Sequence, residues 1–407
     1  MIIPSIDLME GKAVQLKQGK EKILEREDVL DLALEFRKYG DIAVIDIDAA
    51  FGNGNNLGLI KKICKIADCR VGGGIRTIEK ANEILGFGAK KIIIGTKANA
   101  KFLSKLPKDR IIAAVDSRDG FVVKKGWKQK TNEKPVQAVK RLGDFCSGFL
   151  LTNVNMEGLM QGIDFGEVNR IRSLTKNRLT IAGGICSIDE IKKLEEMVID
   201  SQLGMAVYTN RISLPHAFAS LLDFNRNNGL IPTVVQDENS QVLMLAFSNE
   251  ESLLKTFETG KATYFSRSRG KVWSKGETSG NYQKILRVRF DCDRDALLFT
   301  VVQKNFACHS GAYSCFGGKE FDFEEIYDAV KNRIINPKKG SYTSKISANE
   351  NLIKDKIREE AQEVLNYTDE ANLVWEISDL LYFIMVLMAK KEISLLDIKN
   401  ELWKRRK

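Results

Sequence analysis

Proline and long apolar runs are scarce in this sequence of 407 residues. It contains 6 prolines, and its longest apolar run covers residues 380–389. A membrane-spanning helix needs about 20 apolar residues, so this run fits a buried core helix instead. The N-terminus begins with an apolar strand pattern at residues 1–6 and lacks the charged and then apolar order of a signal peptide. We therefore expect a cytoplasmic protein without membrane attachment.

Histidine and cysteine are limited as well, with 2 and 7 residues, respectively. Because the cysteines are scattered or spaced like metal ligands, we expect a reducing compartment. Lys and Arg number 63 against 54 Asp and Glu, a formal net charge of +9, yet no basic run is interleaved with aromatic residues. The excess charge therefore favours phosphorylated small substrates, or solubility alone, over nucleic acid. The length indicates two or three domains.

The N-terminal half of the sequence repeats itself. Residues 4–14 match residues 113–123, and residues 71–77 match residues 181–187, at offsets of 109 and 110 positions. Such coincidences at nearly one offset indicate an internal duplication. Each half contains four β-branched strand patterns, which alternate with amphipathic helices. The expected strands are residues 1–6, 42–47, 68–72, 91–94, 111–115, 148–153, 178–182 and 200–206, and the expected helices include residues 28–39, 77–87 and 187–197.

Eight strand–helix units predict an α/β TIM barrel, built as a half-barrel duplication over residues 1–222. Its active site is expected at the C-terminal ends of the strands, where Asp7, Asp48, Asp116 and Glu157 fall. Glycines after these strands let backbone amides approach a phosphate, and the following helix N-terminus favours the anion. Two related sets suit a substrate with a phosphate at each end. The predicted phosphate-binding residues are Gly73, Gly74, Gly95 and Thr96 in one half, and Gly183, Gly184 and Gly204 in the other.

The segments MIIPSIDLMEGKAVQL, VIDIDAA, VGGGIRT and VDSRDG resemble the ProFAR isomerase family of histidine biosynthesis. The resemblance covers the predicted barrel and implies an Amadori rearrangement of an aminoaldose to an aminoketose, which needs one acid and one base. It implies that Asp7 is the base and that Thr152 contacts the substrate. Many relatives carry the acid as an Asp in an RDG triplet, which here is an MEG triplet. The acid is therefore Glu157 or, alternatively, Asp116.

Downstream of the barrel, soft and hard metal ligands stand side by side. Thiolates select zinc, whereas clustered carboxylates select magnesium or calcium. Three protein ligands leave the fourth position of zinc open for a water, which marks a catalytic site, and His309 could handle a proton there. The alternatives are a structural zinc with His309 as the fourth ligand, or buried cysteines beside an acidic turn. The candidate ligands are Cys292, Cys308 and Cys315 for zinc and Asp291, Asp293 and Asp295 for magnesium.

These ligands belong to a β-rich α+β zinc domain that we predict at residues 226–320. Its expected helix is residues 249–258, and its expected strands are residues 233–235, 241–246, 262–266, 271–273, 284–290 and 296–303. Residues 266–280 are dense in Arg, Lys, Ser, Thr and Gly, which is typical of a phosphate-binding loop, although an exposed basic loop has the same composition. The candidate phosphate-binding residues there are Arg267, Arg269, Trp273, Lys275, Thr278 and Ser279.

The segments GLIPTVVQD, YFSRSRGKVWSKGETSG, DCDRD and CHSGAYSCF resemble the phosphoribosyl-AMP cyclohydrolase family. The resemblance implies zinc at the three cysteines, magnesium at the three aspartates to anchor the substrate phosphate, and hydrolytic opening of the adenine ring. It also implies that His309 shuttles a proton and that the domain forms a homodimer with a shared active site. One departure is Asn281, where the family commonly has His, so His309 must carry more of the proton transfer.

The last segment, residues 322–407, is helical by periodicity, with helices expected at residues 322–335, 345–366, 370–390 and 394–405. Acids at positions i and i+3 share a helix face, so Glu360 with Glu363 and Glu376 with Asp379 could meet as a magnesium site. The alternative is a solvated acidic face paired with residues such as Lys356. The segments KIREEAQEV, EISDLLYFIMVLM and GSYTSK resemble the phosphoribosyl-ATP pyrophosphohydrolase family, all-α magnesium enzymes that direct water between the α and β phosphates.

Together the three resemblances imply three consecutive steps of histidine biosynthesis in reverse chain order. We therefore predict a trifunctional enzyme that hydrolyses phosphoribosyl-ATP to phosphoribosyl-AMP, opens the adenine ring and isomerises the product. One alternative is a bifunctional cyclohydrolase and pyrophosphohydrolase whose barrel is catalytically inactive and serves as a binding or scaffolding module. Nucleic-acid binding, suggested by the charge alone, is a second alternative. The expected partners are phosphorylated ribotides and a second copy of the chain, without nucleic acid or membrane.

Overall fold

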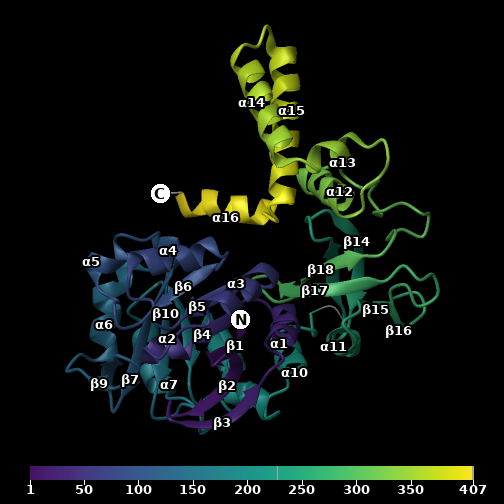
Figure 1. The fold of residues 1–407 in the computed structure, drawn as a ribbon. Helices are drawn as coiled ribbons and strands as arrows, with labels where there is room; N and C mark the ends of the chain where they lie inside the picture. Colours follow the sequence, from purple (N-terminus) through teal and green to yellow (C-terminus); the bar gives the residue numbers. More distant parts are fainter. Residues whose placement is uncertain (227, 406–407) are drawn as a thin grey trace. The chain divides into compact units, whose positions relative to one another are not determined.

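The computed structural model describes residues 1–226 and 228–405, and this part of the chain divides into two compact units (Figure 1). The first unit comprises residues 1–319 and contains the barrel together with the β-rich domain. The second unit, residues 320–405, is helical. The predicted domain limits at residues 222 and 226 both lie inside the first unit.

Eight parallel strands close a barrel in the N-terminal region, which confirms the predicted TIM fold. Each strand pairs with the next, and the last pairs with the first to complete the ring. In order around the ring the strands are β1 (Ile2–Met9), β4 (Ile42–Asp46), β5 (Cys69–Gly72), β6 (Lys91–Ile94), β7 (Ile111–Arg118), β10 (Gly148–Asn153), β11 (Arg178–Ala182) and β12 (Ile199–Leu203).

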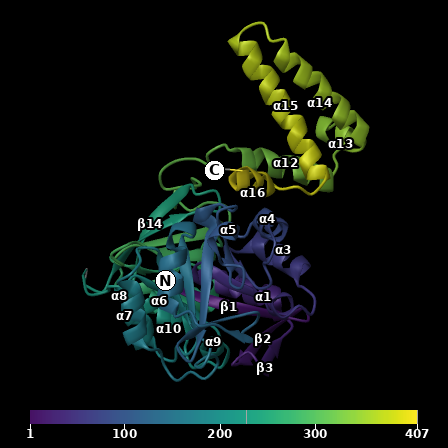
Figure 2. The same ribbon diagram turned by 90° about the vertical axis from the view of Figure 1, so that its left-hand side faces the viewer.

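Helices lie outside this ring, and Figures 1 and 2 show them surrounding the strands. The main helices are α1 (Val29–Phe36), α3 (Leu57–Ile66), α4 (Ile78–Gly86), α6 (Pro135–Leu142), α7 (Phe165–Arg172), α8 (Ile188–Glu196) and α10 (Leu214–Ala219). Shorter ones are α2 (Ile47–Phe51), α5 (Ala100–Leu103) and α9 (Met205–Tyr208). The predicted strand at residues 200–206 ends at Leu203, because Gly204 already caps α9.

Most residues of the barrel strands are buried, because one face packs inside the ring and the other lies under the helices. Inside, Ile93, Ile112, Leu150 and Ala182 form a small separate cluster. The outward-facing residues join one large core with the helices. The strands are therefore short β-branched runs without polar alternation, as in the KIII segment of β6.

Antiparallel hairpins extend two barrel strands beyond the ring, and the sequence did not predict them. β1 pairs with β2 (Lys12–Lys17), which pairs with β3 (Glu21–Arg26). In the duplicated half, β7 pairs with β8 (Phe121–Lys124), which pairs with β9 (Gln129–Lys130). Both extensions follow the C-terminal ends of their strands, which is the face where TIM barrels carry their active sites.

A buried ion network closes the opposite end of the barrel. The Arg70 guanidinium donates to Asp41 at 3.1 Å and to Asp200 at 3.0 Å, and both carboxylates are buried. Arg287 of the β-rich domain adds a bond to Asp41 at 3.2 Å. Beside it, the Tyr39 ring stacks on Phe257 with centroids 4.5 Å apart. The β-rich domain therefore packs on the barrel's N-terminal end, away from the strand ends that carry chemistry.

The β-rich domain is built on a four-stranded mixed sheet with the order β14, β13, β18, β17. Its elements match the predicted ones closely. They are β13 (Ile231–Gln236), β14 (Val242–Ser248), α11 (Glu250–Thr259), the hairpin of β15 (Thr263–Ser266) and β16 (Lys271–Ser274), β17 (Gln283–Phe290) and β18 (Leu297–Gln303).

The helical unit is dominated by two long antiparallel helices, α14 and α15, which lie side by side in Figures 1 and 2. Its helices are α12 (Phe323–Ile335), α13 (Tyr342–Ser347), α14 (Glu350–Leu365), α15 (Glu370–Lys390) and α16 (Leu395–Arg405). The predicted single helix at residues 345–366 was wrong. Asn349 interrupts it, because its side chain caps α14 by accepting a bond from the Asn351 amide at 3.0 Å.

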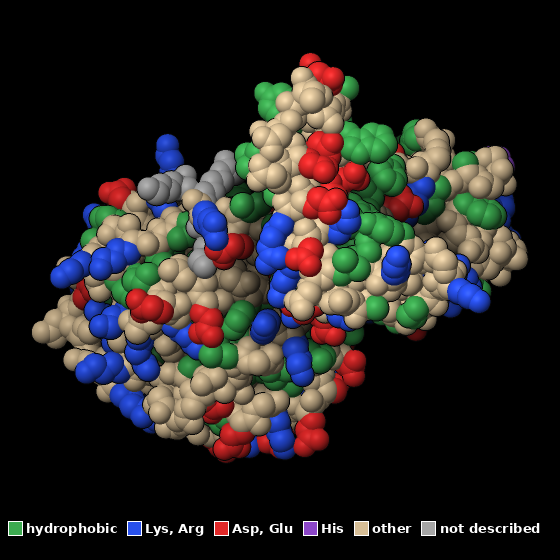
Figure 3. Space-filling view, turned by 45° about the horizontal axis from the view of Figure 1, so that its top comes forward, with side chains coloured by type: hydrophobic (Ala, Val, Ile, Leu, Met, Phe, Trp, Pro, Cys, Tyr) green, Lys and Arg blue, Asp and Glu red, His purple; other side chains and the backbone are tan. Residues whose placement is uncertain are grey.

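Hydrophobic side chains remain visible on the surface of the helical unit in Figure 3, and Val374 and Trp375 of α15 are among the exposed ones. Within the described residues, α15 is the one helix long and apolar enough to cross a membrane by composition. A core helix passes the same test, and α15 carries Glu376 and Asp379 in its middle. Composition alone is therefore weak evidence for a membrane span.

Candidate active sites

A cavity of about 210 Å³ opens at the C-terminal ends of the barrel strands. Three predicted catalytic carboxylates line it: Asp7 from β1, Asp116 from β7, and Glu157 from the loop after β10. Asp7 and Asp116 occupy equivalent places in the two half-barrels, so the duplication brings them into one site. Asp48 does not join them. Its carboxylate accepts bonds from the Glu10 amide at 2.7 Å and from Asn56 Nδ2 at 3.0 Å outside this cavity.

The pKa values of Asp7 and Glu157 are both raised, and the rise is larger for Glu157. Burial raises the pKa of Asp7 to about 6, and the Ser5 hydroxyl, which donates to it at 2.8 Å, opposes that rise. Burial raises the pKa of Glu157 to about 8, and repulsion from Asp7 and Asp116 adds to the rise. At neutral pH Asp7 is therefore mostly ionised while Glu157 mostly keeps its proton. A pair of carboxyl groups divided in this way can serve as base and acid.

Asp116 is held by a tryptophan that sequence reasoning missed. Trp127 donates from its indole Nε1 to Asp116 Oδ2 at 2.9 Å. Burial raises the pKa of Asp116, and this bond and one from Thr152 oppose that rise. The Trp127 ring also covers Gly19, where an added Cβ would lie 2.6 Å from the ring. No local sequence signal identifies Trp127, because its role depends on two hairpins that meet over the cavity.

Most of the phosphate-binding residues predicted in the barrel line the same cavity, together with the predicted substrate contact Thr152. They are Gly73, Gly74, Gly95, Thr96, Gly183 and Gly204, whereas Gly184 is not among the lining residues. Gly73 and Gly74 have positive φ angles of 96° and 64°. An added Cβ at Gly73 would lie 2.2 Å from the Asp46 backbone oxygen, so this turn requires glycine and leaves its backbone open toward the cavity.

In the β-rich domain, the structure brings two of the three candidate zinc ligands together. Cys308 and Cys315 are close enough to perturb each other: the neighbouring thiol contributes to raising the pKa of Cys315, after burial. Cys308 Sγ lies 3.0 Å from Ser310 Oγ and 3.9 Å from His309 Nδ1. In the described chain, the sulfur atoms of Cys292, Cys308 and Cys315 do not all lie within 4.8 Å of one another.

The predicted phosphate loop lies partly beside these two thiols. Burial lowers the pKa of Lys275, and Cys315 and Cys308 oppose that shift by attraction, so the lysine is their neighbour. Trp273 is half-buried, and the Arg269 guanidinium lies 5.6 Å from its ring centroid. Arg267, Arg269, Thr278 and Ser279 are exposed. Asn281 is buried, and its side-chain oxygen accepts a hydrogen bond from Asn305 Nδ2 at 2.9 Å. Its side chain therefore has a structural contact, and an amide cannot transfer a proton as histidine does.

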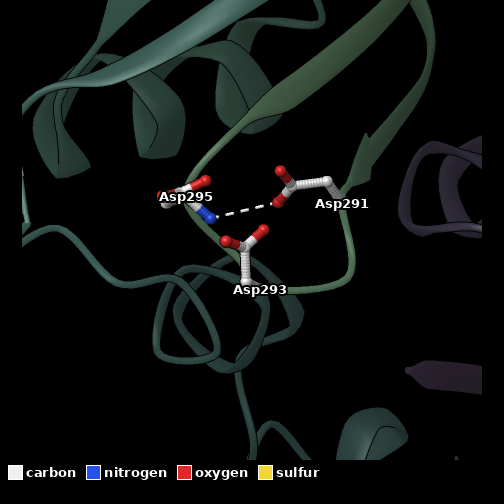
Figure 4. Close-up of side chains that lie close together, drawn as sticks. All are labelled: Asp291, Asp293 and Asp295. Carbon is white, nitrogen blue, oxygen red and sulfur yellow. Dashed lines mark hydrogen bonds between the residues drawn. The ribbon is translucent and has the colours of Figure 1, made fainter.

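The three aspartates of the DCDRD segment do gather. One carboxylate oxygen of each of Asp291, Asp293 and Asp295 lies within 4.8 Å of the others, and Figure 4 shows the three side chains around one turn. The turn is held by the Asp291 carboxylate, which accepts bonds from the backbone amides of residues 295 and 296 at 3.1 Å. A cation already contacts this triad: Arg226 Nη1 lies 2.9 Å from Asp293 and 2.8 Å from Asp295.

The helical unit contains a second carboxylate cluster between α14 and α15. Glu360, Glu363 and Glu376 gather within 4.8 Å. Asp379 is near them, since its charge contributes, after burial and Glu363, to raising the pKa of Glu360. Lys356, whose pairing would indicate a solvated face, contacts Glu359 at 2.8 Å and reaches Glu360 only at 4.0 Å. The buried Glu360 is therefore paired with Lys356 only at long range.

Three family models match the chain in order. The model described as histidine biosynthesis protein matches residues 1–213, phosphoribosyl-AMP cyclohydrolase matches residues 244–317, and phosphoribosyl-ATP pyrophosphohydrolase matches residues 323–406. The TIM barrel with its paired carboxyl groups and the two ligand clusters thus define a multidomain biosynthetic enzyme. The chain belongs to the histidine biosynthesis protein family.

Individual relatives cover different parts of the chain. A bifunctional histidine biosynthesis protein HisIE from Caldanaerobacter subterraneus is 48% identical over 193 residues, which are 44% of this chain and 94% of that protein. A phosphoribosyl imidazole-4-carboxamide isomerase from Methanocaldococcus jannaschii is 38% identical over 230 residues, 53% of this chain and 97% of that protein. A histidine biosynthesis trifunctional protein from Saccharomyces cerevisiae is 38% identical over 179 residues, 44% of this chain and 22% of that protein.

The predicted trifunctional enzyme is therefore confirmed. One chain carries the ProFAR isomerase, phosphoribosyl-AMP cyclohydrolase and phosphoribosyl-ATP pyrophosphohydrolase activities, all of which act on phosphoribosyl substrates. The alternative with an inactive barrel finds no support, because the isomerase region also matches a family model and its three carboxylates line one cavity.

Proposed function

We propose that Asp7 and Glu157 are the base and the acid of the isomerase step. The separation of their pKa values, about 6 and about 8, carries this proposal. Glu157 donates its proton to the ribose ring oxygen as the ring opens, and Asp7 removes the proton from C2 of the sugar. Asp116, which the Trp127 indole holds in place, lies close enough to Glu157 that its repulsion contributes to raising the pKa of Glu157.

The residues around the cavity bind the two ends of the substrate. Gly73 and Gly95 line one side and Gly183 and Gly204 line the other, in equivalent positions of the two half-barrels. Their backbone amides suit phosphate groups, since strand ends in a TIM barrel place free amides at the mouth. A bis-phosphorylated ribotide fits this symmetry, because each phosphate meets one copy of the duplicated site.

For the cyclohydrolase step we propose that zinc is held by Cys308 and Cys315 of one chain and Cys292 of a second copy. The donor set supports zinc, because three thiolates are soft ligands and leave one position open. Zinc, when bound, makes water nucleophilic near neutral pH. His309 follows Cys308 and carries the proton to the opening ring. The three cysteines of the described chain do not form a compact ligand group, and this supports a homodimer through this domain.

Complementation between two variants tests the shared site. Cys292→Ser and Cys308→Ser chains are each expected to lack cyclohydrolase activity, whereas refolded mixtures regain about a quarter of it, because half of the dimers are mixed and each mixed dimer has one intact site. Mixtures that stay inactive would place all three ligands in one chain. The isomerase activity of both variants serves as the control for folding.

For the pyrophosphohydrolase step we propose magnesium at Glu360, Glu363, Glu376 and Asp379. The carboxylate oxygens of Glu360, Glu363 and Glu376 gather between two helices with Asp379 nearby, and hard oxygen ligands suit this ion. Magnesium, when bound, neutralises phosphate charge and orients water between the α and β phosphates. We also propose magnesium at the aspartate triad, where it anchors the phosphate of the cyclohydrolase substrate. A cytoplasmic setting fits the seven free cysteines.

One incubation tests the complete sequence of steps. Purified chain is mixed with phosphoribosyl-ATP, zinc and magnesium, and products are resolved by mass over time. Accumulation of the aminoketose is expected. A stall at the ring-opened, unisomerised ribotide would contradict the roles of Asp7 and Glu157, and a stall at phosphoribosyl-AMP would contradict the proposed zinc site.

A further inference from the structure

The segment that joins the barrel to the β-rich domain places a cation in the aspartate triad. Arg226 follows α10 by a few residues and precedes β13. Its Nη1 atom donates to Asp293 Oδ2 at 2.9 Å and to Asp295 Oδ2 at 2.8 Å. The same segment is fixed to the turn a second time, since the Asp223 amide donates to the Arg294 backbone oxygen at 2.9 Å.

The contacts of Arg226 are acidic. Besides the two aspartates of the triad, its Nε lies 3.4 Å from Asp223. The hydrogen bonds and charges of Asp295 and Asp293 raise the pKa of its guanidinium. The third member of the triad, Asp291, is occupied by the backbone amides of its own turn. Arg226 therefore pairs with the two carboxylates that the backbone amides of residues 295 and 296 do not bond.

A divalent cation in this triad would draw on the same carboxylates, two of which Arg226 already contacts. Magnesium binds carboxylate oxygens at about 2.0 to 2.1 Å with near-octahedral geometry, which leaves no room for a guanidinium on the same lone pairs. Arg226 cannot lose its charge in the physiological range, so the two cations also repel each other. The guanidinium thus shows that the triad accepts a cation, and it occupies the place where the ion would bind.

We propose that Arg226 is the resident counter-cation of the triad and that a divalent cation binds there by displacing it, which releases the linker. The proposal rests on the proposed magnesium site of the cyclohydrolase domain. It adds that the occupancy of this site is coupled to the segment joining two enzyme domains. It also explains why an exposed cluster of three carboxylates keeps its shape without a metal ion, because the arginine balances their repulsion.

Limited proteolysis of the full-length chain measures directly whether the linker around Arg226 is released. Trypsin cleaves after Arg226 only when this side chain leaves the triad and enters the protease. Cleavage at this bond is expected to accelerate when Mg²⁺ is added, whereas cleavage after Lys20, exposed at the turn between β2 and β3, keeps its rate. Equal rates after Arg226 with and without Mg²⁺ would overturn the proposal.

Metal affinity gives the second measurement. Mn²⁺ replaces Mg²⁺ as a spectroscopic probe, and its binding is followed by electron paramagnetic resonance in full-length chains that carry Glu363→Gln and Glu376→Gln to remove the helical site. In this background Arg226→Gln is expected to tighten Mn²⁺ binding about two- to fivefold, the range of an exposed ion pair. Arg226→Lys keeps the positive charge but loses the planar guanidinium. The Mn²⁺ affinity of this variant should therefore lie between that of the chain with Arg226 and that of Arg226→Gln. Lys284→Gln, an exposed cation on β17, is the matched control and leaves the affinity unchanged.

The outcomes separate this proposal from the magnesium site on which it rests. If Asp293→Asn does not weaken Mn²⁺ binding, the triad holds no metal and the proposed site itself fails. If Asp293→Asn abolishes binding while Arg226→Gln leaves the affinity unchanged, the metal site stands and Arg226 does not compete for it.

Discussion

The replacement Glu157→Gln tests the isomerase chemistry at one atom. Glutamine keeps the size and polarity of the side chain but has no acidic proton. Among the hydrogen bonds of the described residues, none involves the Glu157 carboxyl, so the replacement removes no such bond. With a pKa of about 8, about 90% of Glu157 is protonated at pH 7, whereas a glutamate with the ordinary pKa of 4.5 would be protonated to less than about 1%. Asp7, with a pKa of about 6, is about 90% ionised at the same pH.

The expected loss in isomerase kcat is about 100- to 10,000-fold, the range for removal of a general acid. In the wild type, the rate should rise with pH near 6, as Asp7 ionises, and fall near 8, as Glu157 ionises. The variant should lose the fall near 8. It should keep the rise near 6, because burial and not Glu157 raises the pKa of Asp7.

The assay follows conversion of ProFAR by absorbance or mass from pH 5 to pH 9. Glu196→Gln at the exposed end of α8 is the matched control and should keep the wild-type profile. Unchanged kcat in Glu157→Gln would refute the reasoning and transfer the acid role to Asp116. Retention of cyclohydrolase activity by the same preparation shows that the chain is folded.

The same group links stability to pH. The folded state binds the Glu157 proton more tightly than the unfolded state does, so the free energy of unfolding of the barrel falls as pH rises from about 4.5 and levels off above about 8. The full effect is at most about 5 kcal/mol, from the difference between the two pKa values. Glu157→Gln should therefore melt at a higher temperature than the wild type at pH 9 and at the same temperature at pH 4. The opposite order at pH 9 would contradict the raised pKa.

Three further replacements test the other sites, each with the two remaining activities as controls. Trp127→Phe removes the 2.9 Å bond to Asp116 and should lower isomerase kcat about tenfold, as loss of a hydrogen bond to a charged group does; an unchanged kcat would show that the indole only packs. Cys315→Ser should lose bound zinc, measured by elemental analysis, together with cyclohydrolase activity alone, and retention of zinc would argue against the thiol as a ligand. Glu376→Gln should lower pyrophosphohydrolase kcat about 100-fold with unchanged helical circular dichroism, whereas a wild-type rate would place the metal elsewhere.

Local patterns determined most secondary structure of this chain. The strand and helix ranges of the β-rich domain agree with the structure within about two residues, because polar turns and β-branched runs alternate sharply there. The helix predicted at residues 345–366 failed, since apolar periodicity continues through Asn349 while the local side-chain cap breaks the backbone. The hairpins β2–β3 and β8–β9 were missed, because their outer strands β3 and β9 are exposed and polar and carry no strong apolar alternation.

The sequence by itself determined the eight-stranded barrel, the duplicated glycine loops and the identity of the candidate ligands. Internal repeats, hydrophobic periodicity and residue types can all be recognised from the sequence alone. Only the tertiary structure decided which of them meet. It brought Asp7, Asp116 and Glu157 into one cavity, where burial and mutual repulsion divide their acidities. It placed Trp127 on Asp116 and Arg226 in the aspartate triad, and it did not gather the three cysteines of the described chain into one compact group. The energies of these contacts depend on distance and solvent exclusion, which no local pattern encodes.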